Sequence, residues 1–399
     1  MKFVTMSSSK LNRTLGAPGI VLLSLIIGTA GAFLQIGGTS WDVTSHIMRE
    51  PETFFTPSHT VLYTGISMLT ISAGMGGFVL LKGRKDAARY SYSTSYKLLV
   101  IGSAVSLVAG PADFLWHETF GVDGLLSPPH LALITGMLIN STAVVVGLVR
   151  LRYTLLTPNK EKIVRLIMIP AFAALWFTII WYVYMFSLPF SNGENFQLNP
   201  DPILATLIST ALLPLLSSIV FLTASSAIGR LGGATAFAVL VVALNSFANL
   251  IPVDESMILL LPWYTIMTIF PAIVADLALN YLPKTRIMDI KNSKLIAGAI
   301  IGCIFYVFNF PMIAWVFGMS LGMNFDEIQS VDAISNLYSD FQDRLMSTVS
   351  LTMLPGALMG ILGGIIVSRK IFLPPKTILD GVSNKNMEVN GSVSYITDE

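Results

Sequence analysis

Runs of about 20 apolar residues, separated by short polar stretches, recur along the whole chain. A helix needs about that many apolar residues to cross the hydrocarbon core of a bilayer. The pattern therefore predicts an all-α protein, a polytopic transmembrane helical bundle of about ten spans. Their expected positions are residues 17–37, 59–81, 97–117, 130–150, 163–187, 203–226, 232–251, 257–281, 295–318 and 348–368.

The basic residues divide between alternate loops. Of the 24 lysines and arginines, all but Arg49 and Arg344 fall before the first span, after the last, or in the loops on the same side as these two ends. Cytoplasmic loops of membrane proteins are enriched in Lys and Arg. We therefore expect a multi-pass protein of the cell membrane with both ends in the cytoplasm, an N-in, C-in topology.

The composition also indicates that the lipid bilayer is the main partner. Charged residues make up 12% of the chain, whereas soluble domains carry about 25%. A net charge of +1 gives no reason to expect nucleic acid as a partner. The basic start resembles a signal peptide, but no small-residue cleavage site follows the apolar run, so we expect a retained first helix. The single cysteine, Cys303, excludes an intrachain disulfide and a cysteine-based metal cluster.

Three regions are expected along the chain. Residues 1–151 form a duplicated metal-binding transmembrane unit with spans one to four. Residues 152–370 form an additional transmembrane bundle, and residues 371–399 form a polar cytoplasmic tail. The tail lacks apolar periodicity, which is typical of disorder.

The four histidines of the chain fall in two copies of one motif. Each copy reads D-x3-H-x12-H, and the second follows the first by 71 residues. Flanking proline, leucine and glycine positions repeat with the same offset, which indicates an internal duplication of a helix-loop-helix unit. The candidate metal ligands are Asp42, His46 and His59 in the first copy and Asp113, His117 and His130 in the second.

The spacing within each copy predicts one meeting point for its three polar side chains. Residues four apart share a helix face, so Asp42 and His46 project together from the outer end of the first span. Proline suits the first turn of a helix, so Pro57 places His59 at the same depth. Ionisable groups in membrane proteins are costly and usually functional, and imidazole suits copper, zinc, iron or nickel. We therefore expect two metal sites on the extracytoplasmic side; a structural hydrogen-bond network is the alternative.

The first copy, W-D-x3-H to F-T-P-S-H, resembles the C subunit of the copper-dependent membrane monooxygenases, the particulate methane and ammonia monooxygenases. The resemblance implies that the aspartate and two histidines of this copy bind copper. The second copy, ending in S-P-P-H, resembles that family's second copper site. There the family has asparagine in place of Asp113 and one more residue between the histidines. The resemblance covers residues 38–140.

The resemblance implies a copper-dependent monooxygenase subunit, an oxidoreductase that acts on a small hydrophobic substrate. It also implies A- and B-type partner subunits, with a homo-oligomer as the alternative. From the residues alone, an intramembrane zinc-dependent hydrolase stays open because the same ligands would activate water, and so does a non-haem iron site. A metal transport or storage protein is a further possibility. It would need a polar path through the spans, where Asp276 is either a structural charge or a proton relay. An interaction subunit with degenerate sites fits poorly with two intact ligand sets.

Further acidic and aromatic residues lie close to the ligands in sequence. The acidic ones are Glu50, Glu52, Glu118 and Asp123. We expect these to be solvated loop charges, with support of the ligands or proton acceptance as the alternative. The aromatic ones are Trp41, Trp116, Phe54, Phe55 and Phe120. We expect these to form an interfacial aromatic belt, with shaping of a substrate pocket as the alternative.

Overall fold

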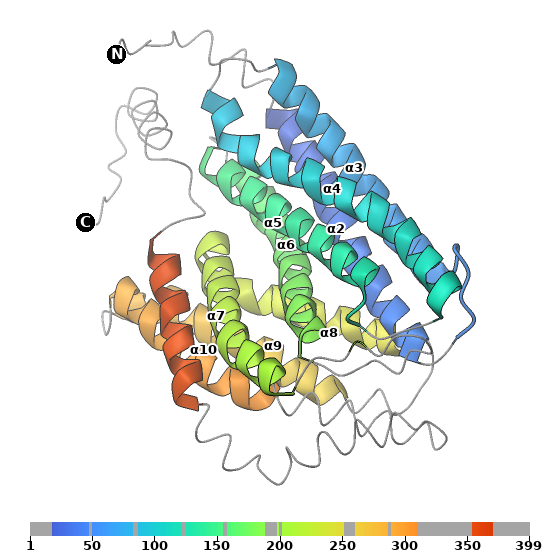
Figure 1. Ribbon diagram of the computed structural model, residues 1–399. Helices are drawn as coiled ribbons and strands as arrows, with labels where there is room; N and C mark the ends of the chain where they lie inside the picture. The colour runs from blue at the N-terminus through green and yellow to red at the C-terminus, as the bar shows by residue number, and fades with distance from the viewer. Residues whose placement is uncertain are drawn as a thin grey trace, which may run out of the picture.

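The computed structural model describes residues 18–47, 50–82, 87–121, 125–154, 158–187, 198, 202–250, 260–285, 289–309 and 353–369, and all regular structure in these ranges is helical (Figure 1). The helices are α2 (Pro18–Ile47), α3 (Pro57–Lys82), α4 (Ala87–Phe120), α5 (Pro128–Thr154), α6 (Pro158–Met185), α7 (Pro202–Ile228), α8 (Gly233–Leu250), α9 (Leu260–Asp276), α10 (Ile290–Asn309) and a helix over Met353–Ser368. A π-helical turn, Leu277–Tyr281, and a 3-10 turn, Leu282–Thr285, follow α9.

A helix overlaps each of the ten segments expected from the apolar runs. Six of these helices, α2 to α7, are long and apolar enough to cross a membrane, and three other apolar helices are shorter. The prediction of an all-helical fold is confirmed for the described residues, with six helices that are long and apolar enough to span a membrane. The number of spans and the sidedness stay predictions. The end of the ninth expected span and the tail over 371–399 lie outside the described residues.

Helices α2 to α5 form a four-helix bundle (Figure 1). Helix α2 packs along α3 and α4 along α5, and the two hairpins meet through α3 against α4 and α2 against α5. Equivalent residues of the two repeats touch where the hairpins meet: Gln35 Nε2 donates to Ser106 Oγ at 3.3 Å. These positions are 71 residues apart, so the contact marks a pseudo-twofold relation between the hairpins.

The same 71-residue offset recurs in the hydrogen bonds inside each hairpin. Ser24 Oγ donates to the carbonyl oxygen of Ser72 at 3.0 Å, linking α2 to α3. Ser95 Oγ donates to the carbonyl oxygen of Ala143 at 2.6 Å, linking α4 to α5. Both members of the second pair lie 71 residues after those of the first. The duplication seen in the sequence is therefore also a duplication of tertiary contacts.

Glycine lets the two helices of the first hairpin approach closely. A Cβ atom on Gly65 would lie 2.6 Å from the carbonyl oxygen of Gly31 and 2.6 Å from the backbone nitrogen of Gln35. We expect Gly65→Ala to force α2 and α3 apart and to lower the free energy of unfolding by about 1–3 kcal/mol. Thermal unfolding in detergent measures this change.

Gly74 on the same helix provides the control, since a Cβ atom there meets no neighbouring atom within 4 Å. Gly74→Ala should keep or raise stability because alanine favours a helix over glycine by about 1 kcal/mol. Equal melting temperatures for the Gly65 and Gly74 variants would contradict the close-packing argument.

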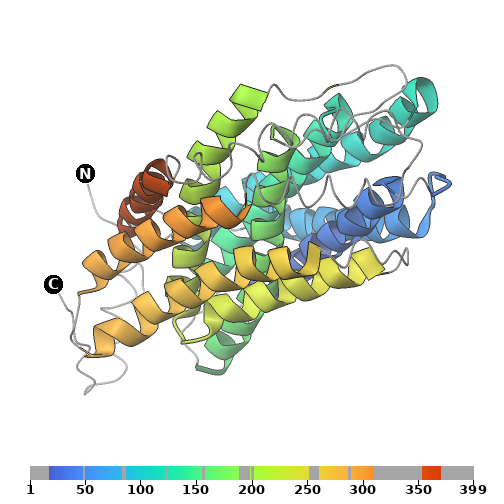
Figure 2. The same cartoon turned by 90° about the horizontal axis from the view of Figure 1, so that it is seen from below.

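Helices α6 to α10 pack beside this four-helix bundle, and Figure 2 shows α8 and α9 side by side. Helix α2 contacts both α6 and α8. Ser40, two residues before Asp42, donates its hydroxyl hydrogen to Asn245 Oδ1 on α8 at 3.2 Å. The second bundle therefore helps to fix the end of α2 that carries the first candidate ligands.

Asp276, the isolated charge of the eighth expected span, is buried and fully engaged in hydrogen bonds. Its Oδ1 accepts from the backbone N–H of Ala234 at 3.1 Å and the hydroxyl of Ser225 at 2.9 Å. Its Oδ2 accepts from the backbone N–H and the hydroxyl of Thr235, both at 2.9 Å. Since Ala234 and Thr235 belong to the first turn of α8, Asp276 caps that helix from α9. These contacts favour the structural role over the proton relay.

Candidate metal centre

The candidate ligands of both copies gather at one end of the four-helix bundle. In each copy the aspartate and first histidine lie near the C-terminal end of one helix, and the second histidine lies in the first turn of the next. Prolines open α3 and α5, as the sequence predicts. The three ligands of each copy therefore lie at the same end of their two helices.

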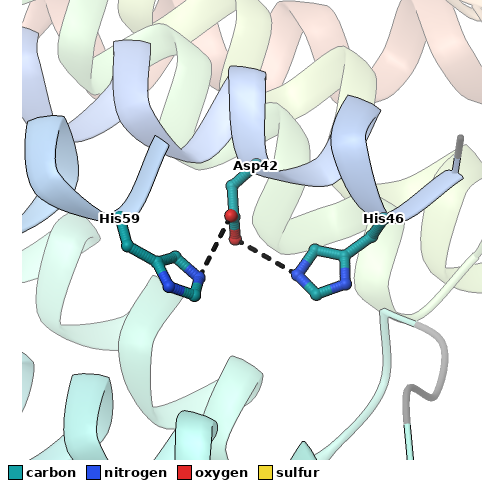
Figure 3. Close-up of side chains that lie close together, drawn as sticks. All are labelled: Asp42, His46 and His59. Carbon is teal, nitrogen blue, oxygen red and sulfur yellow. Dashed lines mark ion pairs between the residues drawn. The ribbon is translucent and has the colours of Figure 1, made fainter. Parts of the chain in front are cut away.

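In the first copy, Asp42 lies between the two histidines (Figure 3). Its Oδ1 is 3.1 Å from His59 Nε2, and its Oδ2 is 3.4 Å from His46 Nε2. Ser58 Oγ donates to the Oδ1 atom at 2.8 Å and orients the carboxylate. One ligand atom from each of the three residues lies within 4.8 Å of the others. The structure therefore assembles the first predicted ligand set.

His59 has the orientation expected of a metal-binding imidazole. Its Nδ1 lies 3.0 Å from the carbonyl oxygen of Thr53. A carbonyl can only accept, so Nδ1 carries the proton and donates it. Metal-bound histidines commonly make this bond with the nitrogen that does not face the ion. The Nε2 atom faces Asp42 and lies 3.3 Å from Glu52 Oε1. An unprotonated nitrogen would repel these two carboxylates, so Nε2 must carry a second proton or bind a cation together with them.

The second copy is assembled in the same way. His130 Nε2 lies 3.2 Å from Asp113 Oδ1, and the rings of His117 and His130 have centroids 5.3 Å apart. One ligand atom from each of these three residues lies within 4.8 Å of the others. Asp113 and His117 are buried, with 6% and 8% of their surfaces exposed. Both predicted ligand sets are thus brought together.

Glu52, from the loop between α2 and α3, lies between the two ligand sets. Its Oε1 is 3.3 Å from His59 Nε2, and its Oε2 is 3.2 Å from His117 Nδ1 and 3.8 Å from His46 Nδ1. With His46 and His117 it makes a third group whose ligand atoms lie within 4.8 Å of one another. The expectation of a solvated loop charge is wrong for Glu52, because this carboxylate contacts three of the four histidines.

The environment of Glu52 keeps its carboxyl group ionised. Burial raises its pKa, but the hydrogen bond from His117 and the charges of the surrounding imidazoles outweigh burial. The pKa of Glu52 is therefore held below its usual value. The other three carboxylates differ: Glu50 and Glu118 are exposed, as expected, and Asp123 lies outside the described residues.

The sequence repeat contained a signal for Glu52 that the motif D-x3-H-x12-H leaves out. Asp123 stands 71 residues after Glu52, so each copy reads D-x3-H-x5-acid-x6-H. An acidic residue thus recurs at the same place between the two histidines. Extending the comparison of the two copies beyond their histidines would have singled out Glu52 as a candidate ligand.

The two copies meet at their first histidines. The rings of His46 and His117, which are equivalent positions of the repeat, have centroids 5.0 Å apart and planes at 70°. Like the hydrogen bond from Gln35 to Ser106, this contact joins two residues that are 71 positions apart and that occupy equivalent places in the two hairpins. The candidate ligands consequently form one continuous cluster, which we call the histidine–carboxylate cluster: Asp42, His46, Glu52, His59, Asp113, His117 and His130.

An aromatic group lies against one side of this cluster. The ring of Phe54 has its centroid 5.0 Å from that of Tyr63 and 5.3 Å from that of Phe114, and Tyr63 is 5.7 Å from His59. Tyr63 and Phe114 were not singled out from the sequence. For Phe54 the contacts with α3 and α4 favour packing beside the ligands over the aromatic belt. Of the remaining predicted aromatics, Phe55 is 74% exposed, Trp116 packs on Phe120 at 4.5 Å, and Trp41 is half-buried.

The donor set fits a transition metal. Imidazole nitrogens and carboxylate oxygens together suit copper, zinc or iron. Two buried ligand atoms, His46 Nε2 and Asp113 Oδ1, lie close to a neighbouring ligand but find no hydrogen-bond partner among the described residues. Buried polar atoms are normally hydrogen-bonded, and a metal ion would satisfy both. A scan against protein-family models and searches of curated proteins and of solved structures find no match to this chain.

Proposed function

We propose that this chain is a membrane-bound metalloprotein whose histidine–carboxylate cluster binds copper and serves the oxidation of a small apolar substrate. The observation that carries the proposal is the set of three overlapping ligand groups, each with its donor atoms within 4.8 Å. The resemblance of residues 38–140 to the monooxygenase C subunits favours copper over other metals. Partner subunits of the A and B type, or a second copy of the chain, belong to the same proposal, as does a position facing the extracytoplasmic side.

The chain's own residues would position the ion and keep water away from it. The hydrogen bond from His59 to the Thr53 carbonyl fixes that imidazole, and the bond from Ser58 fixes Asp42. The rings of Phe54 and Tyr63 provide an apolar surface beside His59. Copper, when bound, would supply one-electron redox and dioxygen chemistry. An apolar substrate would pack on the aromatic side of the cluster.

Metal identity and oxygen consumption test this function. We expect the protein purified in mild detergent to take up as many as two copper ions per chain. With a chemical reductant and a small apolar substrate, it should then consume oxygen in proportion to its copper content. Stoichiometric zinc together with hydrolytic activity would overturn the proposal in favour of the zinc-dependent hydrolase, whose ligand requirements are similar.

Metal transport is less well supported by the contacts. A transporter needs polar side chains within its spans to pass the ion, and Asp276 was the carboxylate considered for this role. It is occupied by four donors from α7 and α8. Within the described residues, the acidic and histidine side chains that could share a metal ion all lie at one end of the four-helix bundle.

A further inference from the structure

We infer that the two ligand sets form a single dinuclear centre in which Glu52 is a ligand shared by both ions. This inference rests on the proposed metal binding but goes beyond it, because two copies of a motif can equally hold two independent ions. Nothing in the D-x3-H-x12-H pattern links one copy to the other. The link comes from the loop residue between them.

The carboxylate of Glu52 contacts histidines of both copies of the motif. Its Oε1 lies 3.3 Å from His59 Nε2 of the first copy and 3.4 Å from His117 Nδ1 of the second. Its Oε2 lies 3.2 Å from His117 Nδ1 and 3.8 Å from His46 Nδ1 of the first copy. A carboxylate that contacts both neighbouring ligand sets is in a position to bridge two cations.

The nitrogens of His46 support the same arrangement. Its Nε2 faces Asp42 at 3.4 Å, and its Nδ1 faces Glu52 at 3.8 Å. His117 likewise presents its Nδ1 to Glu52 at 3.2 Å while it belongs to the ligand set of Asp113 and His130. Both first histidines therefore take part in two of the three groups that could share an ion. The first histidines therefore place the two ligand sets in direct contact, as a shared centre requires.

The carboxylates of the cluster require compensation by cations. The cluster contains three carboxylates, Asp42, Glu52 and Asp113, that are 15%, 16% and 9% exposed at the side chain. Buried carboxylates are costly unless cations compensate them. If all imidazoles are neutral, as ligands must be, a single divalent ion leaves a net charge of −1 and two divalent ions leave +1. The charge of the cluster therefore accommodates a second ion, and the position of Glu52 between the ligand sets favours it.

The loop that carries Glu52 is fixed on both sides. The backbone N–H of Glu50 donates to the carbonyl oxygen of Ser45 at 3.0 Å, which ties the loop to the end of α2. On the other side, the carbonyl of Thr53 accepts from His59, which ties the loop to α3. Glu52 stands between these two attachments. Its carboxylate is therefore held in place by the ligand-bearing helices themselves, as a preorganised ligand should be.

Electron paramagnetic resonance of the full-length protein loaded with Cu(II) tests the shared ligand. In the unsubstituted protein with two ions bound, a bridging carboxylate couples the two spins. The integrated signal should then fall well below two spins per chain. In Glu52→Gln, which cannot bridge as a carboxylate, we expect the signal to rise toward one spin per bound ion. A chelator competition should show the second ion bound about 10–100-fold more weakly than in the unsubstituted protein.

Glu50→Gln is the matched control, since Glu50 lies in the same loop and is exposed. This variant should keep the coupled signal and both affinities. Two copper ions with full spin intensity in the unsubstituted protein, unchanged in Glu52→Gln, would overturn the shared ligand and leave the proposed copper function intact. Folded protein that binds no copper at all would overturn both, so the two failures are distinguishable.

Discussion

Replacing His59 with alanine is expected to remove one metal ion and to weaken binding in the first ligand set by about 100-fold or more, since loss of even a supporting contact commonly costs 10–100-fold. The physical reason is the double role of this side chain. Its Nε2 lies 3.1 Å from Asp42 and 3.3 Å from Glu52, and its Nδ1 bonds to the Thr53 carbonyl. Metal titration of the purified protein with a competing chelator measures the loss.

Thr60→Ala provides the control for this substitution. Thr60 is the next residue of α3, is exposed, and donates its hydroxyl hydrogen to the carbonyl oxygen of Phe55 at 3.4 Å. Metal content should be unchanged in this variant. If His59→Ala bound the same number of ions with the same affinity, the first ligand set would have been assigned wrongly.

The second large effect is expected at Asp276, where alanine should lower the free energy of unfolding by about 2–5 kcal/mol, since each buried donor left without an acceptor costs about 1–3 kcal/mol. The substitution leaves the backbone N–H groups of Ala234 and Thr235 without their acceptor inside the protein. It also removes the negative charge at the start of α8. Thermal unfolding in detergent, followed by tryptophan fluorescence, measures the change.

Two further variants separate capping from proton transfer. Asp289 caps α10 at an exposed position, where it accepts from the backbone N–H of Asn292 at 3.1 Å. Asp289→Ala should therefore lower the free energy of unfolding by only about 1 kcal/mol. Asp276→Asn keeps an acceptor oxygen, so its free energy of unfolding should lie between those of the alanine variant and the unsubstituted protein. A stable Asp276→Ala protein with lost activity would indicate a proton relay instead.

Local rules in the sequence were sufficient for the helices and for each ligand set separately. Apolar runs of membrane-spanning length located the helices, and residues four apart on one helix placed Asp42 beside His46. Proline at the start of α3 placed His59 opposite them. These relations involve one helix or one tight connection, so the sequence alone determines them. The same rules placed the three ligands of the second copy.

Contacts between separate elements could not be predicted in this way. Glu52 has its role because α4 brings His117 against the loop between α2 and α3, and no local pattern specifies that approach. Asp276 appeared as a lone charge because the helix it caps begins more than 40 residues earlier in the chain. Tyr63 lies beside the cluster and packs over Gly110 of α4, where a Cβ atom would lie 3.1 Å from its ring. In each case the partner is defined by the tertiary fold.

X-ray absorption at the copper edge, combined with elemental analysis of the same sample, tests the metal centre most directly. Two copper ions per chain are expected, each bound by nitrogen and oxygen atoms with the outer-shell scattering typical of imidazole. Folded protein that takes up no transition metal at saturating copper would contradict this expectation. The seven residues of the cluster would then be held together by hydrogen bonds and charged imidazoles alone.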